Sequence, residues 1–217
     1  MSTTELPPNH WAQAERNALA DTKLERGPDA PTLCEGWAAR ELAGHLIVRE
    51  GRNLPASLGI FVGPLKSYSD KKQKAATDGP WSRAVETIRN GPPKGTMGHK
   101  PKVDGAMNTI EYFVHHEDVR RGTDGWEPRT LPAEQAEDLW TRLSTQFGKR
   151  LTRKSPVGVK VRHTDGREVV VKEGPNPVTV VGDPGELVLY LFGRSASRVE
   201  VQGDPADVAQ LTGSLGI

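Results

Sequence analysis

The sequence predicts an α+β protein in which a helical bundle is followed by a small α/β domain. Up to about residue 152, apolar residues recur at the three- and four-residue spacing of amphipathic helices, with Gly and Pro between the segments. After Pro156 the pattern changes to the alternation of β-strands, and Val becomes frequent. The chain of 217 residues is long enough for two small domains. We therefore place a helical domain at residues 1–152 and an α/β domain at residues 153–217.

The helical part contains predicted helices and one ambiguous segment. The helices are expected at residues 9–26, 37–52, 81–89, 107–121 and 132–150. The first is stopped by Gly27-Pro28, and the fourth is stopped at Gly122. Residues 53–80 are ambiguous. The first part, LPASLGIFVGPL, is apolar but interrupted by Pro and Gly, and the polar part, SYSDKKQKAATDGP, predicts a loop or a frayed helix.

The C-terminal part begins with a predicted β-hairpin. Its two strands are VGVKVRHTDG and REVVVKEG, joined by a Thr-Asp-Gly turn. A third strand is expected in PVTVVGD and a fourth in SRVEVQGD. Between them, residues 184–192 predict a helix capped by Asp183, and residues 205–213 predict a short last helix.

Composition argues against several classes of protein. The 29 Lys and Arg residues nearly balance the 28 Asp and Glu residues, whereas a nucleic-acid-binding domain is usually strongly basic. The single cysteine cannot form an internal disulfide, which indicates a reducing cytosol. No apolar run approaches the ~20 residues of a membrane span, and the N-terminus lacks the pattern of a signal peptide. We expect a cytoplasmic protein without nucleic-acid or membrane partners.

The segment at residues 107–121 carries the clearest chemical signal. One face of this helix would present Met107, Ile110, Glu111, Val114, His115 and Asp118. Its apolar members predict that the face points inward, where an unpaired carboxylate is costly. Glu111 and His115 lie one turn apart and could bind one divalent ion. Two alternatives stay open: a capping box formed by Asn108 and Glu111, and a core histidine bonded to a neighbour.

A third metal ligand is expected from the second helix. His45 lies between Leu42 and Leu46, on or beside an apolar face, so it could meet Glu111 and His115 in the bundle. Two histidines and one carboxylate with an open position form a common zinc site. A lone histidine beside leucines is more often structural, and that role for His45 also stays open.

Other polar residues near these candidates give weaker signals. His116 points about 100° away from His115 on a helix, which predicts a supporting or surface position. Cys34 precedes the second helix and is interpreted as a small buried residue, the alternative being a nucleophile at a helix N-terminus. Arg120 and Arg121 favour the negative end of the helix dipole and could also anchor an anionic substrate.

Several motifs together resemble a known family. These are Leu33-Cys-Glu-Gly-Trp37, Arg40-Glu-Leu-x-x-His45, and Glu111-x-x-x-His115 followed by Asp118. They resemble the mycothiol-dependent maleylpyruvate isomerase family, which belongs to the DinB/YfiT-like group of metal-binding four-helix bundles. The stretch from Glu111 to Arg121 is most similar to an actinobacterial subgroup of unassigned function. The similarity continues into the C-terminal part, including Leu191-Phe-Gly-Arg194.

The resemblance implies a DinB-like four-helix bundle followed by the small α/β domain. It implies that His45, Glu111 and His115 bind a divalent metal, zinc, and that Arg194 is the catalytic residue. It also implies mycothiol as cofactor and a thiol-dependent isomerase or transferase, in which the metal activates a thiolate toward an electrophilic substrate. Arg194 would hold a substrate anion from across an interdomain cleft.

Two alternatives to this function remain. The first is a metal-dependent hydrolase that uses metal-bound hydroxide and no thiol. The second is a non-enzymatic metal-binding module, in which Asp118 would be the nearest residue to close the site as a fourth ligand. The sequence itself does not indicate the substrate or an oligomeric state.

Overall fold

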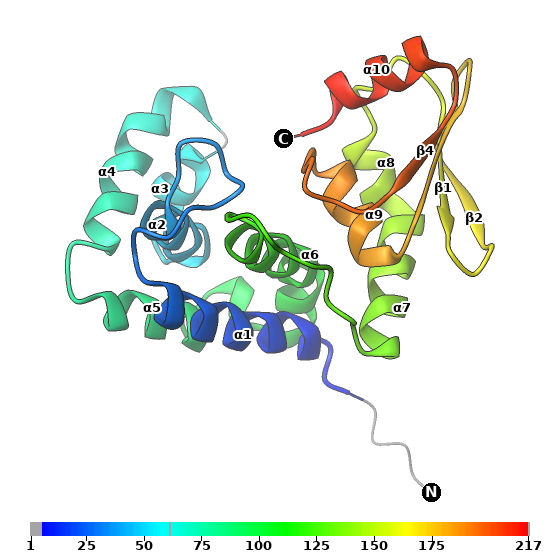
Figure 1. Ribbon diagram of the computed structural model, residues 1–217. Coiled ribbons are helices and arrows are strands. Elements are labelled where there is room, and N and C mark those ends of the chain that lie inside the picture. Colours follow the sequence, from blue (N-terminus) through cyan, green and yellow to red (C-terminus); the bar gives the residue numbers. More distant parts are fainter. Residues whose placement is uncertain (1–5, 61, 217) are drawn as a thin grey trace, which may run out of the picture. The chain divides into compact units, whose positions relative to one another are not determined.

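A computed structural model describes residues 6–60 and 62–216 (Figure 1). The chain divides into two compact units, of which the first ends at Trp126 and the second begins at Glu127. The predicted α+β class is confirmed. All named strands lie between Val159 and Gln202, and among the described residues before them only an isolated bridge joins Pro31 to Ala38.

The first unit is a bundle of helices. They are α1 (His10–Arg26), α2 (Ala39–Glu50), α3 (Leu54–Gly59), α4 (Lys66–Ala76), α5 (Trp81–Asn90) and α6 (Pro101–Arg120), with short 3₁₀ turns at Gly63–Leu65 and Met97–His99. α1 packs against α5 and α6, and α2 packs against α4 and α5. The core between them includes Leu19, Leu42, Leu46, Ile88, Tyr112 and Val119.

The ambiguous stretch at residues 53–80 is mostly helical, as α3 and α4. α4 is polar along most of its length, and Ser69 is its only described residue that is buried. It lies directly against α2, because a Cβ atom placed on Gly44 would be 2.5 Å from the carbonyl oxygen of Gln73. Because Gly44 has no side chain, the backbones of α2 and α4 can pack closely there, although the apolar pattern of α4 is weak.

Helix α6 begins at Pro101, earlier than the predicted start at residue 107. Proline suits this position, because the N–H groups of a helix's first turn have no partner within the helix, so the N–H that proline lacks is not missed there. Asn108 consequently lies inside the helix, where its side chain donates to the Asp104 carboxylate at 2.7 Å. The capping box of Asn108 and Glu111 was therefore a wrong interpretation.

Helices α1 and α6 run side by side in the same direction. Hydrogen bonds join Asn9 to Asp104, Thr22 to His116, and Arg26 to the Val119 carbonyl, at sequence separations of 95, 94 and 93. The nearly constant separation means that helices α1 and α6 run in the same direction along this contact.

A fully buried arginine ties three helices together. Arg16 of α1 is 0% exposed, and its guanidinium donates to Asp104 of α6 and to Glu50 of α2, at 2.6 Å in each case. Its Cζ also lies 4.4 Å from the centre of the Tyr112 ring. A buried guanidinium is tolerated because two carboxylates pair with it.

The second unit is a four-stranded sheet with helices. Its elements are α7 (Ala133–Arg142), α8 (Gly148–Leu151), β1 (Val159–His163), β2 (Glu168–Lys172), β3 (Val178–Gly182), α9 (Pro184–Leu191), β4 (Glu200–Gln202) and α10 (Pro205–Ser214). The strand order is β2-β1-β3-β4. β1 pairs antiparallel with β2 and parallel with β3, and β3 pairs antiparallel with β4.

The helix predicted at residues 132–150 is interrupted and groups with the sheet. A wider turn at Leu143–Phe147 separates α7 from α8, and Thr145 leaves helical geometry there. α7 packs against α9, and α8 packs against β2. Sequence analysis placed this segment in the bundle, with a boundary near residue 152, whereas the contacts divide the chain after Trp126.

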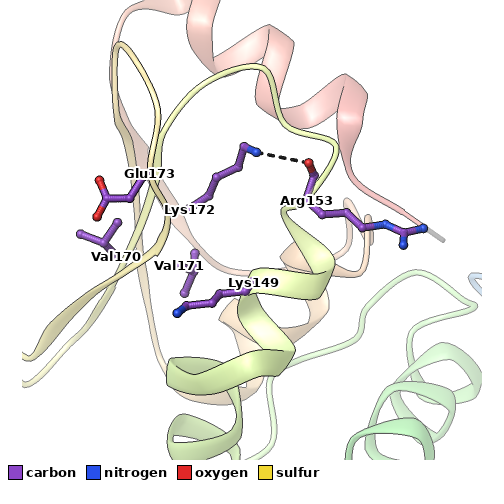
Figure 2. A pocket seen from close by; sticks show the side chains of 6 residues that line it. All are labelled: Lys149, Arg153, Val170, Val171, Lys172 and Glu173. Carbon is purple, nitrogen blue, oxygen red and sulfur yellow. Dashed lines mark hydrogen bonds between the residues drawn. The ribbon is translucent and has the colours of Figure 1, made fainter.

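A basic hollow opens beside the edge strand β2. Its volume is about 440 Å³, and its lining residues are Lys149, Arg153, Val170, Val171, Lys172 and Glu173 (Figure 2). Lys172 is fixed by donating to the backbone carbonyl of Arg153 at 3.2 Å. Arg194 is not one of the residues that line this hollow. Within the described part of the chain, no helix combines the length and apolar character needed to cross a membrane.

Candidate metal centre

Three potential metal ligands from two helices converge in the first unit. His45 comes from α2, and Glu111 and His115 come from α6. The Glu111 Oε1 atom lies 3.7 Å from His45 Nε2 and 3.3 Å from His115 Nε2. All three donor atoms lie within 4.8 Å of one another. Neighbouring ligands of a tetrahedral zinc ion, bound at about 2.0–2.1 Å, are roughly 3.3 Å apart. The donor types and their spacing therefore fit a zinc-type ion.

Local packing places these side chains. Glu111 and His115 are one turn apart on α6, so their side chains share a face. His45 lies between Leu42 and Leu46, which are both fully buried and anchor α2 in the core. The His45 ring contacts Trp37 at 5.2 Å between ring centres and His115 at 5.5 Å.

Glu111 is held in its charged form. Burial alone raises the pKa of this carboxyl group, but hydrogen bonds from His115 and His45 and the charge of Arg49 lower it more. The result is a pKa well below the ordinary range for Glu111. The Arg49 Nε atom is 3.1 Å from Glu111 Oε1. An ionised carboxylate is the form that binds a metal.

The two histidines differ in protonation. Burial lowers the pKa of His45, which favours the neutral ring that a metal requires. Burial also opposes the charge on His115, but hydrogen bonds to Asp118, Cys34 and Glu111 outweigh it and raise its pKa well above the ordinary value. A metal must therefore displace a proton from His115. The His45 Nδ1 atom is buried and has no hydrogen-bond partner among the residues that the structure describes, whereas Nε2 lies close to Glu111.

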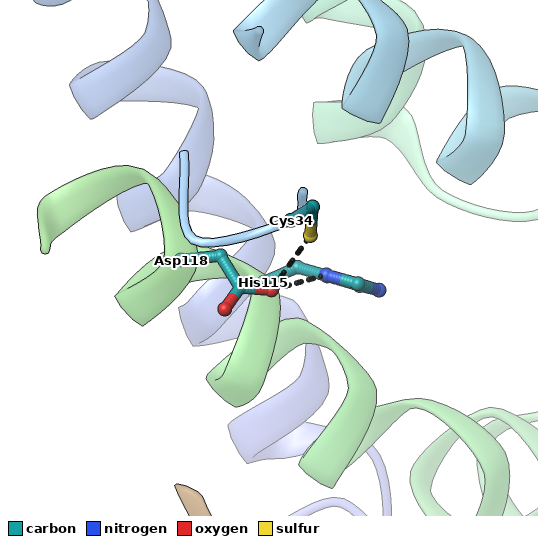
Figure 3. Close-up of side chains that lie close together, drawn as sticks. All are labelled: Cys34, His115 and Asp118. Atoms are coloured by element: carbon teal, nitrogen blue, oxygen red, sulfur yellow. Dashed lines mark hydrogen bonds and ion pairs between the residues drawn. The ribbon is translucent and has the colours of Figure 1, made fainter. Parts of the chain in front are cut away.

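Asp118 lies at the opposite edge of the His115 ring from Glu111. Its Oδ2 atom is 2.9 Å from His115 Nδ1 and accepts a hydrogen bond from the Cys34 thiol at 3.1 Å (Figure 3). A carboxylate at Nδ1 fixes a metal-binding histidine so that Nε2 is directed to the ion. Asp118 thus does not join His45 and Glu111 as a fourth ligand. It belongs with Cys34 and His115.

Cys34 is the polar residue whose surroundings sequence analysis missed. It was interpreted as a small buried residue, but it is only partly buried, and its thiol contacts Asp118 across 84 positions of sequence. The loop reaches α6 because the Leu33 backbone N–H donates to the Asp118 carbonyl at 3.0 Å. The only sequence signal for this contact was that Cys34 and Asp118 both belong to the motifs quoted above.

Met107 on α6 differs from the expectation, and for His116 the structure excludes one of the two expected positions. Met107 is 56% exposed, so the predicted inward face begins only at Ile110, one turn further along the helix. His116 is buried rather than at the surface. Its ring contacts Glu15 at 2.8 Å and Thr22 at 3.0 Å, because the α6 face beside the candidate centre packs against α1.

The two arginines at the end of α6 pair with a carboxylate of the same helix. Arg121 is buried and donates to Glu117 at 2.6 Å, and Arg120 donates to the same carboxylate at 2.9 Å. These pairs show a structural use for both side chains.

Arg194 follows the end of α9 in the second unit. Its Nη1 atom donates to the Phe192 carbonyl at 2.9 Å, and its guanidinium lies 6.0 Å from the centre of the Phe192 ring. The three potential metal ligands are in the first unit. The catalytic role expected for Arg194 remains a prediction.

Comparison with solved structures identifies the fold. A crystal structure of the mycothiol-dependent maleylpyruvate isomerase matches with a TM-score of 0.58 and 15% sequence identity, covering 93% of this chain and 96% of that one. The chain shares the fold of mycothiol-dependent maleylpyruvate isomerase. A histidine-to-alanine variant of that isomerase matches with the same TM-score and coverage, at 14% identity. The resemblance inferred from sequence is confirmed at the level of fold. No family model and no curated relative matches the chain.

Proposed function

We propose that the chain is a divalent-metal-dependent enzyme that uses a low-molecular-weight thiol and acts on a small electrophilic substrate. The observation that carries the proposal is the convergence of His45, Glu111 and His115 on one point. The fold supports it, because an isomerase with this fold is described as mycothiol-dependent. Zinc is the proposed metal, since two imidazoles and one carboxylate with an open position suit it. Mycothiol is the proposed thiol, and isomerisation or S-transfer is the proposed reaction.

The bound metal would lower the pKa of a coordinated thiol into the neutral range and so supply a nucleophile. The chain's own residues prepare the site for it. Hydrogen bonds from His115 and His45, together with the charge of Arg49, keep Glu111 ionised, and burial keeps His45 neutral. Asp118 holds the His115 ring by its Nδ1 atom and leaves Nε2 for the ion. The Trp37 ring packs against His45 and limits its motion.

Arg194 has a separate role in this proposal. A guanidinium can bind a substrate carboxylate through two parallel hydrogen bonds, which lysine cannot reproduce. We therefore expect Arg194→Lys to raise the KM for an anionic substrate while leaving the zinc content unchanged. Zinc content should be equal in Arg194→Lys and wild type in either case, so the KM decides. An unchanged KM in Arg194→Lys would remove Arg194 from the proposal.

The test combines metal content with thiol dependence. Wild type, His45→Ala, Glu111→Gln and the control His99→Ala are stripped of metal, reloaded with zinc and measured by elemental analysis. His99 is exposed, lies in the short turn before α6 and belongs to neither group of potential ligands, so this control should retain the metal. Isomerisation of maleylpyruvate, the substrate named for the structural neighbours, is then followed with and without mycothiol.

We expect zinc at His45, Glu111 and His115 and thiol-dependent turnover in wild type and in His99→Ala. The other two variants should each bind one equivalent of zinc fewer than wild type and lose the turnover. Zinc bound by His45→Ala and Glu111→Gln with both the stoichiometry and the affinity of wild type would refute the metal site. Zinc-dependent hydrolysis of an ester or amide substrate that needs no thiol would favour the hydrolase instead.

A further inference from the structure

We propose that Cys34, His115 and Asp118 form a second metal site, for a thiophilic divalent cation of the zinc class, and that His115 is shared between this site and the first. The second site concerns metal binding alone, so it does not depend on the proposed enzymatic function. Its residues are a thiol, an imidazole and a carboxylate, which are three of the side-chain groups that bind zinc in proteins.

The donor atoms of this cluster are already close together. Cys34 Sγ lies 3.1 Å from Asp118 Oδ2, and His115 Nδ1 lies 2.9 Å from the same oxygen. All three atoms lie within 4.8 Å of one another. Figure 3 shows Cys34 reaching from its loop toward the two side chains of α6. Small outward movements of these groups would open the spacing of roughly 3.3 Å that ligands of one ion require.

The two nitrogens of His115 face different groups. Nε2 is 3.3 Å from Glu111, in the first set of donors, and Nδ1 is 2.9 Å from Asp118, in the second. One ring can therefore serve two ions without rotating. Binding of the second ion displaces the thiol proton of Cys34 and the proton between His115 and Asp118, and both protons pass to solvent.

The loop that carries Cys34 is held by contacts within itself, with α6 and with the residue Gly122 just after α6. The Leu33 N–H donates to the Asp118 carbonyl at 3.0 Å, and the Thr32 hydroxyl donates to the Trp37 carbonyl at 2.7 Å. At the other side of the loop, Gly122 approaches the backbone of Pro31 so closely that a Cβ atom would not fit. The thiol is thus positioned before any ion arrives, which reduces the entropy lost on binding.

The ligand chemistry and the surroundings favour a soft cation. Thiolate selects zinc or cadmium over magnesium and calcium, which prefer oxygen. Cys34 is partly exposed, which provides a route for the ion, whereas Asp118 is fully buried. The side chain of Lys23 interacts electrostatically with both Cys34 and Asp118. Burial lowers the pKa of Lys23 to about 7, so this lysine loses its charge more readily than an exposed one.

Cobalt titration tests the second site, because a cobalt–thiolate bond has a charge-transfer band in the near ultraviolet. Reduced, metal-free wild type is titrated with Co²⁺ while absorbance and bound metal are measured. We expect the thiolate band and a second equivalent of metal. Cys34→Ser should lose both and keep the first equivalent, while His45→Ala should keep the band. His99→Ala is the control and should behave as wild type.

A single equivalent in wild type with no thiolate band would overturn the proposal, as would a Cys34→Ser variant that binds as much metal as wild type. If Cys34→Ser does not fold, cadmium NMR of wild type decides the question, since a thiolate ligand shifts the resonance strongly and its absence refutes the site. Failure of the proposed function has a different signature, which is wild type with the thiolate band but without thiol-dependent turnover.

Discussion

Lys23 is a fully buried lysine that makes the stability of the fold depend on pH. Its side chain is 0% exposed, and its ammonium group donates to the Ala39 carbonyl at 2.7 Å. Burial lowers its pKa from 10.5 to about 7, against the attraction of Cys34, Asp118 and Glu41. In the unfolded chain the group keeps its proton up to the ordinary pKa. Between these two values the unfolded state binds more protons than the folded state, so stability rises with pH.

The size of the effect follows from the two pKa values. A difference of one bound proton changes the free energy of unfolding by about 1.4 kcal/mol for each pH unit. We therefore predict that wild type gains about 2.5 kcal/mol relative to Lys23→Met between about pH 7.5 and 9.5. Methionine also cannot donate to Ala39, which costs about 1 kcal/mol at every pH and leaves the slope unaffected.

The assay is a series of urea melts followed by circular dichroism, with chelator present so that metal binding does not contribute. Lys66→Met is the matched control, since the Lys66 side chain is 71% exposed and pairs only with Asp70 among the ion pairs of the structure as described. It should follow the pH dependence of wild type. If the free energy of unfolding depends on pH with the same slope in wild type and in Lys23→Met, the lowered pKa of Lys23 is refuted.

Three further predictions concern the candidate metal centre. His115→Ala should abolish zinc uptake and cost about 1–3 kcal/mol of stability while the bundle stays helical, as measured by elemental analysis and thermal melts; chelated wild type that is unfolded at room temperature would instead indicate a structural metal. Asp118→Asn should weaken zinc binding about 10–100-fold in a competition titration, and an unchanged affinity would contradict its orienting role. Zinc affinity of wild type should keep rising with pH above the ordinary histidine range, because Asp118, Cys34 and Glu111 raise the pKa of His115 and its proton competes with the ion. A plateau already reached at about pH 7 would contradict this.

The parts of the fold that sequence predicted are those with a local cause. The Val alternation after Pro156 correctly predicted β1, β2 and β3. The helical spacing before it correctly predicted α1, α2, α5 and α6. Helix α4 was left undecided between a loop and a frayed helix, because its position depends on the close approach of Gly44 to Gln73, which its own pattern does not show. The break at Thr145 likewise has no marker in the predicted helix at 132–150.

The candidate site divides in the same way. Glu111 and His115 could be paired from their spacing on one helix, and the resemblance to a family added His45. Cys34 could not be placed, because its contact with Asp118 depends on how a loop folds back onto α6. Met107 was assigned to the inward face by periodicity alone, although it lies near the start of α6 on a side that is exposed together with Ala106.

The parallel contact between α1 and α6 has a consequence for the energetics of ligand binding. Asn9 holds the beginning of α6 at Asp104, and Thr22 and Arg26 hold its end at His116 and Val119. A helix fixed at both ends can neither slide by a residue nor rotate about its axis without breaking these bonds. The conformational entropy of Glu111, His115 and Asp118 is therefore largely lost when the bundle folds. The binding of an ion does not have to offset this cost again. The affinity of the centre should then vary with the chemistry of the donor atoms and little with the length of the connecting loops.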